Sequence, residues 1–551
     1  MPDQLQLRGG TTSEHNSFTG AAREVTVDTT KKTLVVHDGS TAGGTPLMKE
    51  SGVNSDVAFH GVTVGKGAGS VSSNTVLGQA ALDANTTGHS NVAIGVNALT
   101  TNQTGHSAVA IGEDALKLAT GNGNTAVGAN TLQATTTGFS NVAVGRSALY
   151  SNTTGNYNVG IGLNALTFNI SGIENTAVGS SALQANTTGS KNVAFGMNCL
   201  DANTSGYENS AFGHNALSNN TTGNYNTAVG RSALALNTTG MSNNSVGYLS
   251  LDANTTGSNN NAFGREALTD NTTGIQNCAF GHEALEDNTT ASDNTAFGFR
   301  SLRNNITGTQ NTAVGSGALQ VNTGSYNSGF GYAALNANTS GTKNTAVGVQ
   351  SLDANTSGNY NVAIGHNSLG LNTTGSSNIA IGRAALTTST TTSGNIAIGD
   401  EALQLNTGDA NIAIGRNAMD ANTTGVACTA IGNNALGKSN TNNCVAIGNG
   451  AMAENTSGTE NVAVGTYALD ANTTGQSNTA VGTYALGQST TAGNNTAIGK
   501  SSLTSNTTGG NNTGVGYQTL LYNTTGYSNT AIGSYAMEDA TTAYKNTAVG
   551  L

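Results

Sequence analysis

Three histidines occupy one place in a recurring pattern, and they are the first residues of this 551-residue chain that could bind a metal. His214, His282 and His366 each directly follow a glycine that ends a segment resembling N-T-A-V-G. Imidazole nitrogens bind zinc, but a zinc site needs three or four ligands that converge. The same place also holds Arg146 and Tyr248, so it accepts very different side chains. We therefore expect exposed turn residues and no metal site.

Six aspartates recur in the tetrapeptide L-D-A-N, where they could supply calcium ligands or the paired carboxylates of a glycosidase. They are Asp83, Asp201, Asp252, Asp353, Asp420 and Asp470. Calcium loops need several oxygen ligands, whereas each of these loops carries one isolated acid. We expect a solvated loop edge, and a groove that degrades polysaccharide is the lesser alternative.

Four cysteines are too few and too scattered for a disulfide framework or a zinc site. They are Cys199, Cys278, Cys428 and Cys444. Cys428 and Cys444 replace a recurring asparagine in successive repeats, so stacking would bring their Cα atoms to ~5 Å, within disulfide range. We expect free thiols all the same, and a cytoplasmic origin.

Motifs for catalysis are not evident in the sequence, and neither are a P-loop or a dinucleotide fingerprint. The 75 glycines recur with the repeat, which indicates turn geometry and not a phosphate cradle. The sequence therefore predicts that the chain is not an enzyme, with no catalytic residue, no cofactor and no metal.

A repeat of 16 or 17 residues organises most of the chain. The glycine that ends each N-T-A-V-G segment, here called the anchor glycine, recurs from Gly78 to Gly550. These 29 glycines enclose 28 intervals, of which 24 are 17 residues long and four are 16. The unit reads N-T-A-V-G-x-x-A-L-x-x-N-T-T-G-x-x, and we expect a degenerate unit around Gly61 to precede it.

Each unit carries two adjacent pairs of a small and a large apolar residue, such as Ala93-Ile94 and Ala98-Leu99. Neighbouring residues on a strand point to opposite faces, so each pair predicts a short strand that is apolar on both faces. We expect two strands per unit, one face lining the coil and the other meeting a neighbouring chain. Six phenylalanines before anchor glycines, between Phe195 and Phe330, predict a bulkier stretch of core.

Asparagine recurs four residues before the anchor glycine in 26 of 29 units, and seven residues after it in most units. Stacked at one turn spacing, these side chains would form ladders in which each amide bonds the next. The four short units, residues 113–128, 316–331, 400–415 and 433–448, keep the anchor-to-leucine spacing. Their missing residue lies in the N-T-T-G part, which is therefore expected to be a loop.

Composition and energetics favour an assembled repeat over a globular domain. Two large apolar side chains per unit contribute roughly 3–6 kcal/mol of burial, whereas ordering one unit's backbone costs ~17 kcal/mol or more. Stacking and partner chains must supply the difference, and at ~4.8 Å per turn the stack would span roughly 130 Å. The net charge of −11 disfavours nucleic acid. No membrane helix or signal segment is evident.

The first 44 residues have a different character. Glu24–Asp28 and Thr33–His37 alternate as two strands around a polar turn, and Asp38-Gly39 predicts a second turn. The start RGGT, the core FTGAAREVTVDT and the turn VVHDG resemble the N-terminal β-prism of phage major tropism determinants. That resemblance implies an intertwined trimeric module at the start of a virion receptor-binding protein.

The repeat NTAVGxxALxxNTTG resembles repeats of phage tail fibres, and it is similar to the head repeats of trimeric autotransporter adhesins. The resemblance implies an all-β, parallel β-solenoid or β-roll that forms a homotrimer. We predict an N-terminal β-prism-like trimerising and attachment head in residues 1–52, a transition with a degenerate first turn in 53–73, and a solenoid shaft in 74–551. The lectin-like domain of the tropism determinants has no evident counterpart. Leu551 lies one residue past an anchor glycine, and because solenoid ends need a cap we expect the C-terminal end to be processed, trimmed or docked to another protein.

These features together predict a structural virion fibre that mediates or supports attachment to a host surface. The expected partners are two identical chains, a baseplate, tail or capsid protein at the N-terminal segment, and a host glycan or protein receptor or a separate tip protein at the other end. No nucleic acid and no membrane insertion are expected, and assembly would occur in the host cytoplasm. A bacterial trimeric adhesin is the alternative, followed by a polysaccharide-degrading tailspike and, more distantly, an ice-binding solenoid.

Overall fold

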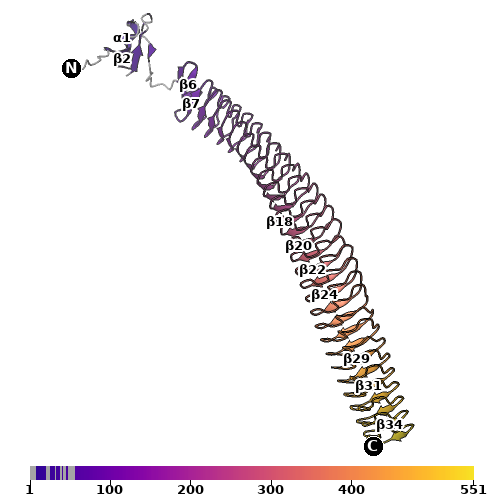
Figure 1. Ribbon diagram of the computed structural model, residues 1–551. Coiled ribbons are helices and arrows are strands. Elements are labelled where there is room, and N and C mark those ends of the chain that lie inside the picture. Colours follow the sequence, from indigo (N-terminus) through magenta and orange to yellow (C-terminus); the bar gives the residue numbers. More distant parts are fainter. Residues whose placement is uncertain are drawn as a thin grey trace, which may run out of the picture. The chain divides into compact units, whose positions relative to one another are not determined.

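The computed structural model describes residues 8–19, 21, 25–30, 33–37, 40, 42, 45–46 and 56–551. The chain divides into two compact units, residues 1–239 and 240–551, and the same coil is built within each (Figure 1). The fold is all-β and consists mainly of a parallel β-solenoid. Among the described residues, no helix is long and apolar enough to cross a membrane.

A separate four-stranded sheet forms from the N-terminal segment, in the order β1 (Arg8–Gly10), β2 (Val25–Asp28), β3 (Thr33–Val36) and β4 (Thr45–Pro46). The two strands predicted here are confirmed, since β2 and β3 pair antiparallel with Val25 opposite Val36. The turn predicted at Asp38-Gly39 lies outside the described residues.

A short helix, α1 (Thr12–Ser17), follows β1, and the sequence analysis did not predict it. Its start is a capping box: the Glu14 carboxylate accepts from the Thr11 backbone N–H at 2.6 Å, and the Glu14 N–H donates to the Thr11 hydroxyl at 3.4 Å. Such reciprocal bonds satisfy amide groups that the first helical turn leaves open.

An antiparallel hairpin begins the solenoid. Strands β5 (Val57–Phe59) and β6 (Val62–Gly65) pair antiparallel, and β6 pairs antiparallel with β7 (Thr75–Gly78). A 3-10 turn, η1 (Ala68–Ser70), lies between β6 and β7. The segment around Gly61 is therefore a hairpin that covers the edge of the first strand and not a degenerate parallel turn. Covering an edge in this way protects unpaired backbone groups.

One strand from each repeat then adds in parallel to the strand before it. Within residues 1–239, Thr125 of β10 lies opposite Val109 of β9 on one side and Val142 of β11 on the other. The strands of this ladder are β8 (Val92–Ile94), β9 (Val109–Ile111), β10 (Thr125–Val127), β11 (Val142–Val144), β12 (Val159–Ile161), β13 (Thr176–Val178), β14 (Val193–Phe195), β15 (Ser210–Phe212) and β16 (Thr227–Val229).

Residues 240–551 likewise contribute one strand per repeat, and Figure 1 shows β18 to β34 as successive steps of one ladder. Its strands are β17 (Asn244–Val246), β18 (Asn261–Phe263), β19 (Cys278–Phe280), β20 (Thr295–Phe297), β21 (Thr312–Val314), β22 (Ser328–Phe330), β23 (Thr345–Val347), β24 (Val362–Ile364), β25 (Ile379–Ile381), β26 (Ile396–Ile398), β27 (Ile412–Ile414), β28 (Thr429–Ile431), β29 (Val445–Ile447), β30 (Val462–Val464), β31 (Thr479–Val481), β32 (Thr496–Ile498), β33 (Thr513–Val515), β34 (Thr530–Ile532) and β35 (Thr547–Val549).

The prediction of two strands per repeat is wrong, because the second small–large pair forms a turn. Leu149 has φ of 53°, in the left-handed region that a strand excludes and that costs an L-residue about 1 kcal/mol or more. This turn directs both Ala148 and Leu149 inward, where both are fully buried. The Leu149 N–H donates to the Ala165 carbonyl of the following turn at 2.9 Å. The same geometry recurs at the leucine of nearly every repeat.

The core of the coil is narrow, and small residues define it. The middle residue of each parallel strand from β8 to β34, such as Ala143, points inward and is buried, as are the alanine and leucine of the turn at Ala148 and Leu149. Backbone hydrogen bonds join successive turns around the loops as well as in the strands, for example Val142 N–H to Asn158 O at 2.8 Å. Two alanines and one leucine per turn leave little room in the interior for anything larger.

The anchor glycine is required by close approach of the next turn. Gly365 has φ of 134°, and a Cβ built there would lie 2.4 Å from the Gly382 carbonyl oxygen. No L-side chain tolerates both that conformation and that distance. The anchor glycine that follows each parallel strand therefore allows successive turns to lie this close together.

Candidate interaction surfaces

Two rows of buried asparagines run along the inside of the coil, as predicted. In the first row, four residues before each anchor glycine, Asn141 donates from its backbone N–H and its side-chain amide to Asn124 Oδ1, at 3.0 and 3.1 Å. The same amide donates to the Gly155 carbonyl at 2.9 Å. In the second row, Asn186 donates to Asn169 Oδ1 at 2.7 Å. The amides thus bond from turn to turn and satisfy loop carbonyls that the interior hides from water.

Two cysteines take over this role where the first row is interrupted. Cys428 and Cys444 are buried, free thiols. The Cys444 thiol donates to the Gly458 carbonyl at 3.3 Å, and the Cys428 thiol donates to the Thr441 carbonyl at 3.1 Å. These carbonyls hold the place that Gly155 holds opposite Asn141. The thiols are therefore weaker substitutes for the asparagine amide.

The four short turns keep their strands in register and shorten only the edge loop, as predicted. Ser328 of β22 still lies opposite Thr312 of β21. The Asn322 amide donates to Gly324 O two residues ahead, whereas Asn338 of the next turn reaches Gly341 three residues ahead. The loop between the second asparagine row and its glycine therefore absorbs the missing residue.

The outer face of the strand ladder carries what we call the outer row, the large apolar residue directly before each anchor glycine. Every such residue is Val, Ile, Leu or Phe. Phe195, Phe212 and Phe330 remain 40% exposed and Ile498 remains 41% exposed. A continuous exposed apolar row of this kind marks an interaction surface.

The phenylalanines of this row are not core residues, so the prediction of a bulkier core is wrong. Strand alternation places the alanine inside and the phenylalanine outside. There the rings stack from turn to turn, with centroids 4.5 Å apart for Phe263 and Phe280 and 4.6 Å apart for Phe280 and Phe297. These stacks make the outer row broadest and most apolar in this stretch.

The three histidines singled out by the sequence follow three different strands, β15, β19 and β24, and His282 has acidic neighbours. One ligand atom each of Glu266, His282 and Glu283 lies within 4.8 Å of the others. Glu283 also accepts from Arg300 Nε at 2.6 Å and lies 3.1 Å from Arg303 Nε. The Arg300 hydrogen bond holds the pKa of Glu283 below its usual value. An ion-pair network across adjacent turns thus occupies the carboxylate that a metal would need.

Sequence reasoning missed this network because Glu266 and Glu283 lie 17 residues apart. Both glutamates stand two residues after an anchor glycine, so the 17-residue repeat places them on successive turns. Side chains that depart from the repeat consensus, such as these two glutamates, form the surface clusters.

The L-D-A-N aspartates lie in the loop of their turns; Asp83 is exposed and the other five are half-buried. Burial raises the pKa of Asp201, Asp353, Asp420 and Asp470. Burial, with a contribution from the Asp270 charge, raises the pKa of Asp252 to about 6. Asp252 and Asp270 lie on successive turns, so a second carboxylate is present on the turn next to Asp252.

These features define a class: a repeat protein built as a parallel β-solenoid, preceded by a small N-terminal sheet. Residues 5–41 match the family described as the Major tropism determinant N-terminal domain. The Tail fiber receptor-binding protein of Bordetella phage BPP-1 is 65% identical to this chain over 49 residues. That match covers 9% of this chain and 13% of the phage protein. The resemblance seen in the RGGT, FTGAAREVTVDT and VVHDG segments is thereby confirmed, and it concerns the N-terminal segment.

Proposed function

We propose that this chain is a structural tail fibre of a bacteriophage that mediates or supports attachment to the host surface. The observation that carries the proposal is the match of residues 5–41 to a domain found in a phage tail fibre receptor-binding protein. The β-solenoid that follows is a suitable projecting shaft, since each turn adds one step to a ladder. In this proposal the N-terminal segment joins a baseplate, tail or capsid protein, and exposed residues of the shaft or a separate tip protein meet the host glycan or protein receptor.

The working unit in this proposal is a homotrimer. The outer row leaves an apolar side chain at least partly exposed on every turn, and identical chains in identical register are the partners that can cover it along its whole length. An interior of alanine and leucine is thin for a coil of this size. Burial of the outer row against two sister chains supplies the apolar contact that a single chain leaves open.

A non-catalytic role agrees with the chemistry of the loops. The half-buried aspartates lie on a solvated edge, and the Glu283 carboxylate is compensated by two arginines. The proposed partners include neither nucleic acid nor a membrane interior, in keeping with the net charge of −11. We further propose that the fibre assembles in the host cytoplasm and resides on the virion.

Immunogold labelling of purified virions tests the function. An antibody against the segment 5–41 is expected to decorate the tail, and the purified chain added in excess is expected to reduce phage adsorption to host cells. Labelling of the bacterial envelope in uninfected cells, with none on virions, would contradict the proposal and favour a bacterial adhesin. Depolymerisation of host polysaccharide by the purified chain would instead favour a tailspike.

A further inference from the structure

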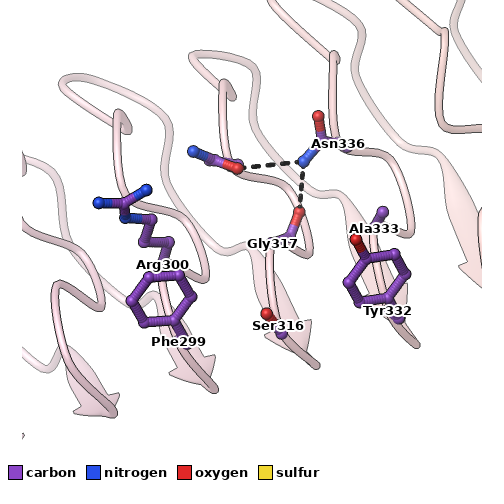
Figure 2. A pocket seen from close by; sticks show the side chains of 8 residues that line it. Phe299, Arg300, Ser316, Gly317, Tyr332, Ala333 and Asn336 are labelled. Carbon is purple, nitrogen blue, oxygen red and sulfur yellow. Dashed lines mark hydrogen bonds between the residues drawn. The ribbon is translucent and has the colours of Figure 1, made fainter.

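One hollow within residues 240–551 is lined by no residue of the asparagine rows or the outer row. Its volume is about 160 Å³. Three successive turns form it, and Figure 2 shows Phe299 and Tyr332 on either side of Ser316. The lining residues are Phe299, Arg300, Ser316, Gly317, Gln320, Tyr332, Ala333 and Asn336.

The hollow exists because the middle turn carries small residues where its neighbours carry large ones. The residue directly after the anchor glycine is Phe299 in the first turn, Ser316 in the second and Tyr332 in the third. The two aromatic residues are therefore two turns, about 9.6 Å, apart along the coil. Gly317 follows Ser316 with φ of 66°, in a place where the two neighbouring turns carry Arg300 and Ala333.

The aromatic walls offer apolar surface that the protein itself leaves uncovered. Phe299 is 46% exposed and Tyr332 is 60% exposed. Phe299 is held in place by the turn before it: its ring stacks on His282 with centroids 5.6 Å apart. The Arg300 guanidinium carbon lies 4.7 Å from the centre of the same ring. A fixed aromatic wall is suited to contact the C–H groups of a ring-shaped ligand.

The polar wall is a pair of side-chain amides that orient each other. The Asn336 amide nitrogen donates to the Gly317 carbonyl at 2.8 Å and to Gln320 Oε1 at 3.3 Å. These two bonds use the Asn336 amide nitrogen and the Gln320 amide oxygen. Within the described residues, no hydrogen bond occupies the Gln320 amide nitrogen or the Asn336 amide oxygen. One donor and one acceptor therefore remain for adjacent hydroxyl groups of a ligand.

The charge of the hollow is nearly neutral. Arg300 is the one charged lining residue, and its Nε donates to the Glu283 carboxylate at 2.6 Å. The chain as a whole carries a net charge of −11, which disfavours anionic ligands. The volume is also below the range of roughly 300–1,000 Å³ typical of drug-sized ligands, so a single small ring is the appropriate size.

We propose that this hollow binds one neutral hexopyranose unit of a glycan, with its C–H groups against Phe299 and Tyr332 and its hydroxyls bonded to Gln320 and Asn336. The proposal rests on the attachment function proposed above and names the substrate class. The hollow uses residues that follow the anchor glycine, whereas the outer row uses the residue before it. Sugar binding and chain assembly therefore draw on different positions of the turn.

Saturation-transfer NMR on the full-length protein tests the proposal, with methyl β-glucopyranoside, methyl β-galactopyranoside and methyl α-mannopyranoside as probes. At least one neutral glycoside is expected to receive saturation at its ring C–H protons. Ser316→Tyr fills the hollow with a side chain that this surface position accepts elsewhere, and Tyr332→Ser removes one wall. Each variant is expected to lower the affinity at least about tenfold. Tyr517→Ser, which removes an exposed aromatic residue from the same place of another turn, is the matched control and should bind normally.

The proposal is overturned if no neutral glycoside receives saturation, or if binding persists unchanged in Ser316→Tyr. Binding of glucuronate in preference to all three neutral glycosides would overturn the assignment of a neutral sugar. Because the measurement uses isolated protein and defined sugars, a negative result leaves the virion-labelling test of the proposed function unaffected. Conversely, a chain that binds these sugars but is absent from virions would refute the fibre function alone.

Discussion

At the scale of single residues, buried amides specify the stacking of the turns. An alanine–leucine core would tolerate small shifts of one turn on the next, because apolar contacts have little directionality. A shift that separates a buried asparagine from its hydrogen-bond partner costs more free energy, because a buried polar group without a partner is not compensated for its loss of water. Asn344 illustrates the arrangement: its amide donates to Asn327 Oδ1 at 3.2 Å and to Gly358 O at 2.8 Å.

Replacing Asn344 with alanine is expected to destabilise the protein by about 2 kcal/mol. The Asn361 backbone N–H, which donates to Asn344 Oδ1 at 2.9 Å, would lose its acceptor in a fully buried place. Gly358 O would keep its second donor, the Asn355 amide at 3.1 Å, which limits the loss. Chemical denaturation measures the effect, with Thr374→Ala on the exposed loop edge as control. Equal stability of the two variants would contradict the role of the asparagine row.

Cys444 provides a test in the opposite direction. Cys444→Asn restores the consensus amide facing the Gly458 carbonyl and is expected to stabilise the protein by about 1 kcal/mol. Cys444→Ala removes the donor and should destabilise it, because the thiol currently donates to that carbonyl at 3.3 Å. Thermal unfolding of both variants provides the measurement. The reverse order of stability would contradict the view that the thiol substitutes for an amide.

Asp252 gives the loop edge a pH dependence. Its folded pKa of about 6 lies above the value of ~3.9 for an unfolded chain, so the folded state binds the proton more tightly. Stability from this group is therefore highest below pH ~4 and is lost as the pH rises through about 6. Asp252→Asn should stabilise the protein at pH 8 by about 1 kcal/mol, a value reduced for solvent screening of a half-exposed group. Thermal unfolding should show no such gain at pH 4, and an equal gain at both pH values would refute the assignment.

At the scale of the repeat, the strand and the edge loop differ in what they tolerate. The strand alternates alanine inside with a large residue outside, so a shift of one residue would drive every large side chain into a core sized for alanine. The edge loop already exists in two lengths. Two of the four short turns show that the asparagine-to-glycine hydrogen bond of this loop re-forms with one residue fewer.

An insertion experiment separates the two elements. Inserting one threonine between Thr323 and Gly324 restores the 17-residue length and is expected to change stability by less than about 0.5 kcal/mol. Inserting one threonine between Thr312 and Ala313, in β21, should disrupt the ladder locally and lower the unfolding temperature strongly. Circular dichroism during heating would measure both. Equal tolerance of the two insertions would contradict the division of the repeat into a fixed strand and a free loop.

The period, the parallel ladder, the asparagine rows and the loop that absorbs deletions were all predictable from the sequence, because each depends on residues at a constant spacing. The second strand was not. Ala98-Leu99 has the composition of a strand, and only the left-handed conformation of Leu99, φ 53°, makes it a turn. Surface sites were missed for another reason: the pairing of Phe299 with Tyr332 appears only when departures from the consensus are aligned turn by turn.

At the scale of the whole molecule, the outer row is the feature that a single chain leaves unexplained. A row of apolar side chains that stay at least partly exposed on each turn favours association with another surface. Stacked rings at Phe263, Phe280 and Phe297 strengthen that tendency over several turns. The interaction proposed here is with two identical chains, for which each row is covered by the corresponding rows of its partners.

Phe297→Glu is the variant that tests the outer row, because a carboxylate in a buried apolar contact is costly. It should weaken assembly while leaving the coil itself intact, since Phe297 contributes nothing to the interior. Tyr326→Glu, at a side chain that is 54% exposed on the loop edge, is the control and should assemble normally.

The most direct test of the whole account is the mass of the protein in solution, measured by sedimentation equilibrium at micromolar concentration. The account predicts a particle of three times the 54.9 kDa chain, and a lower mass for Phe297→Glu under the same conditions. A stable wild-type monomer of 54.9 kDa with an exposed outer row would contradict it.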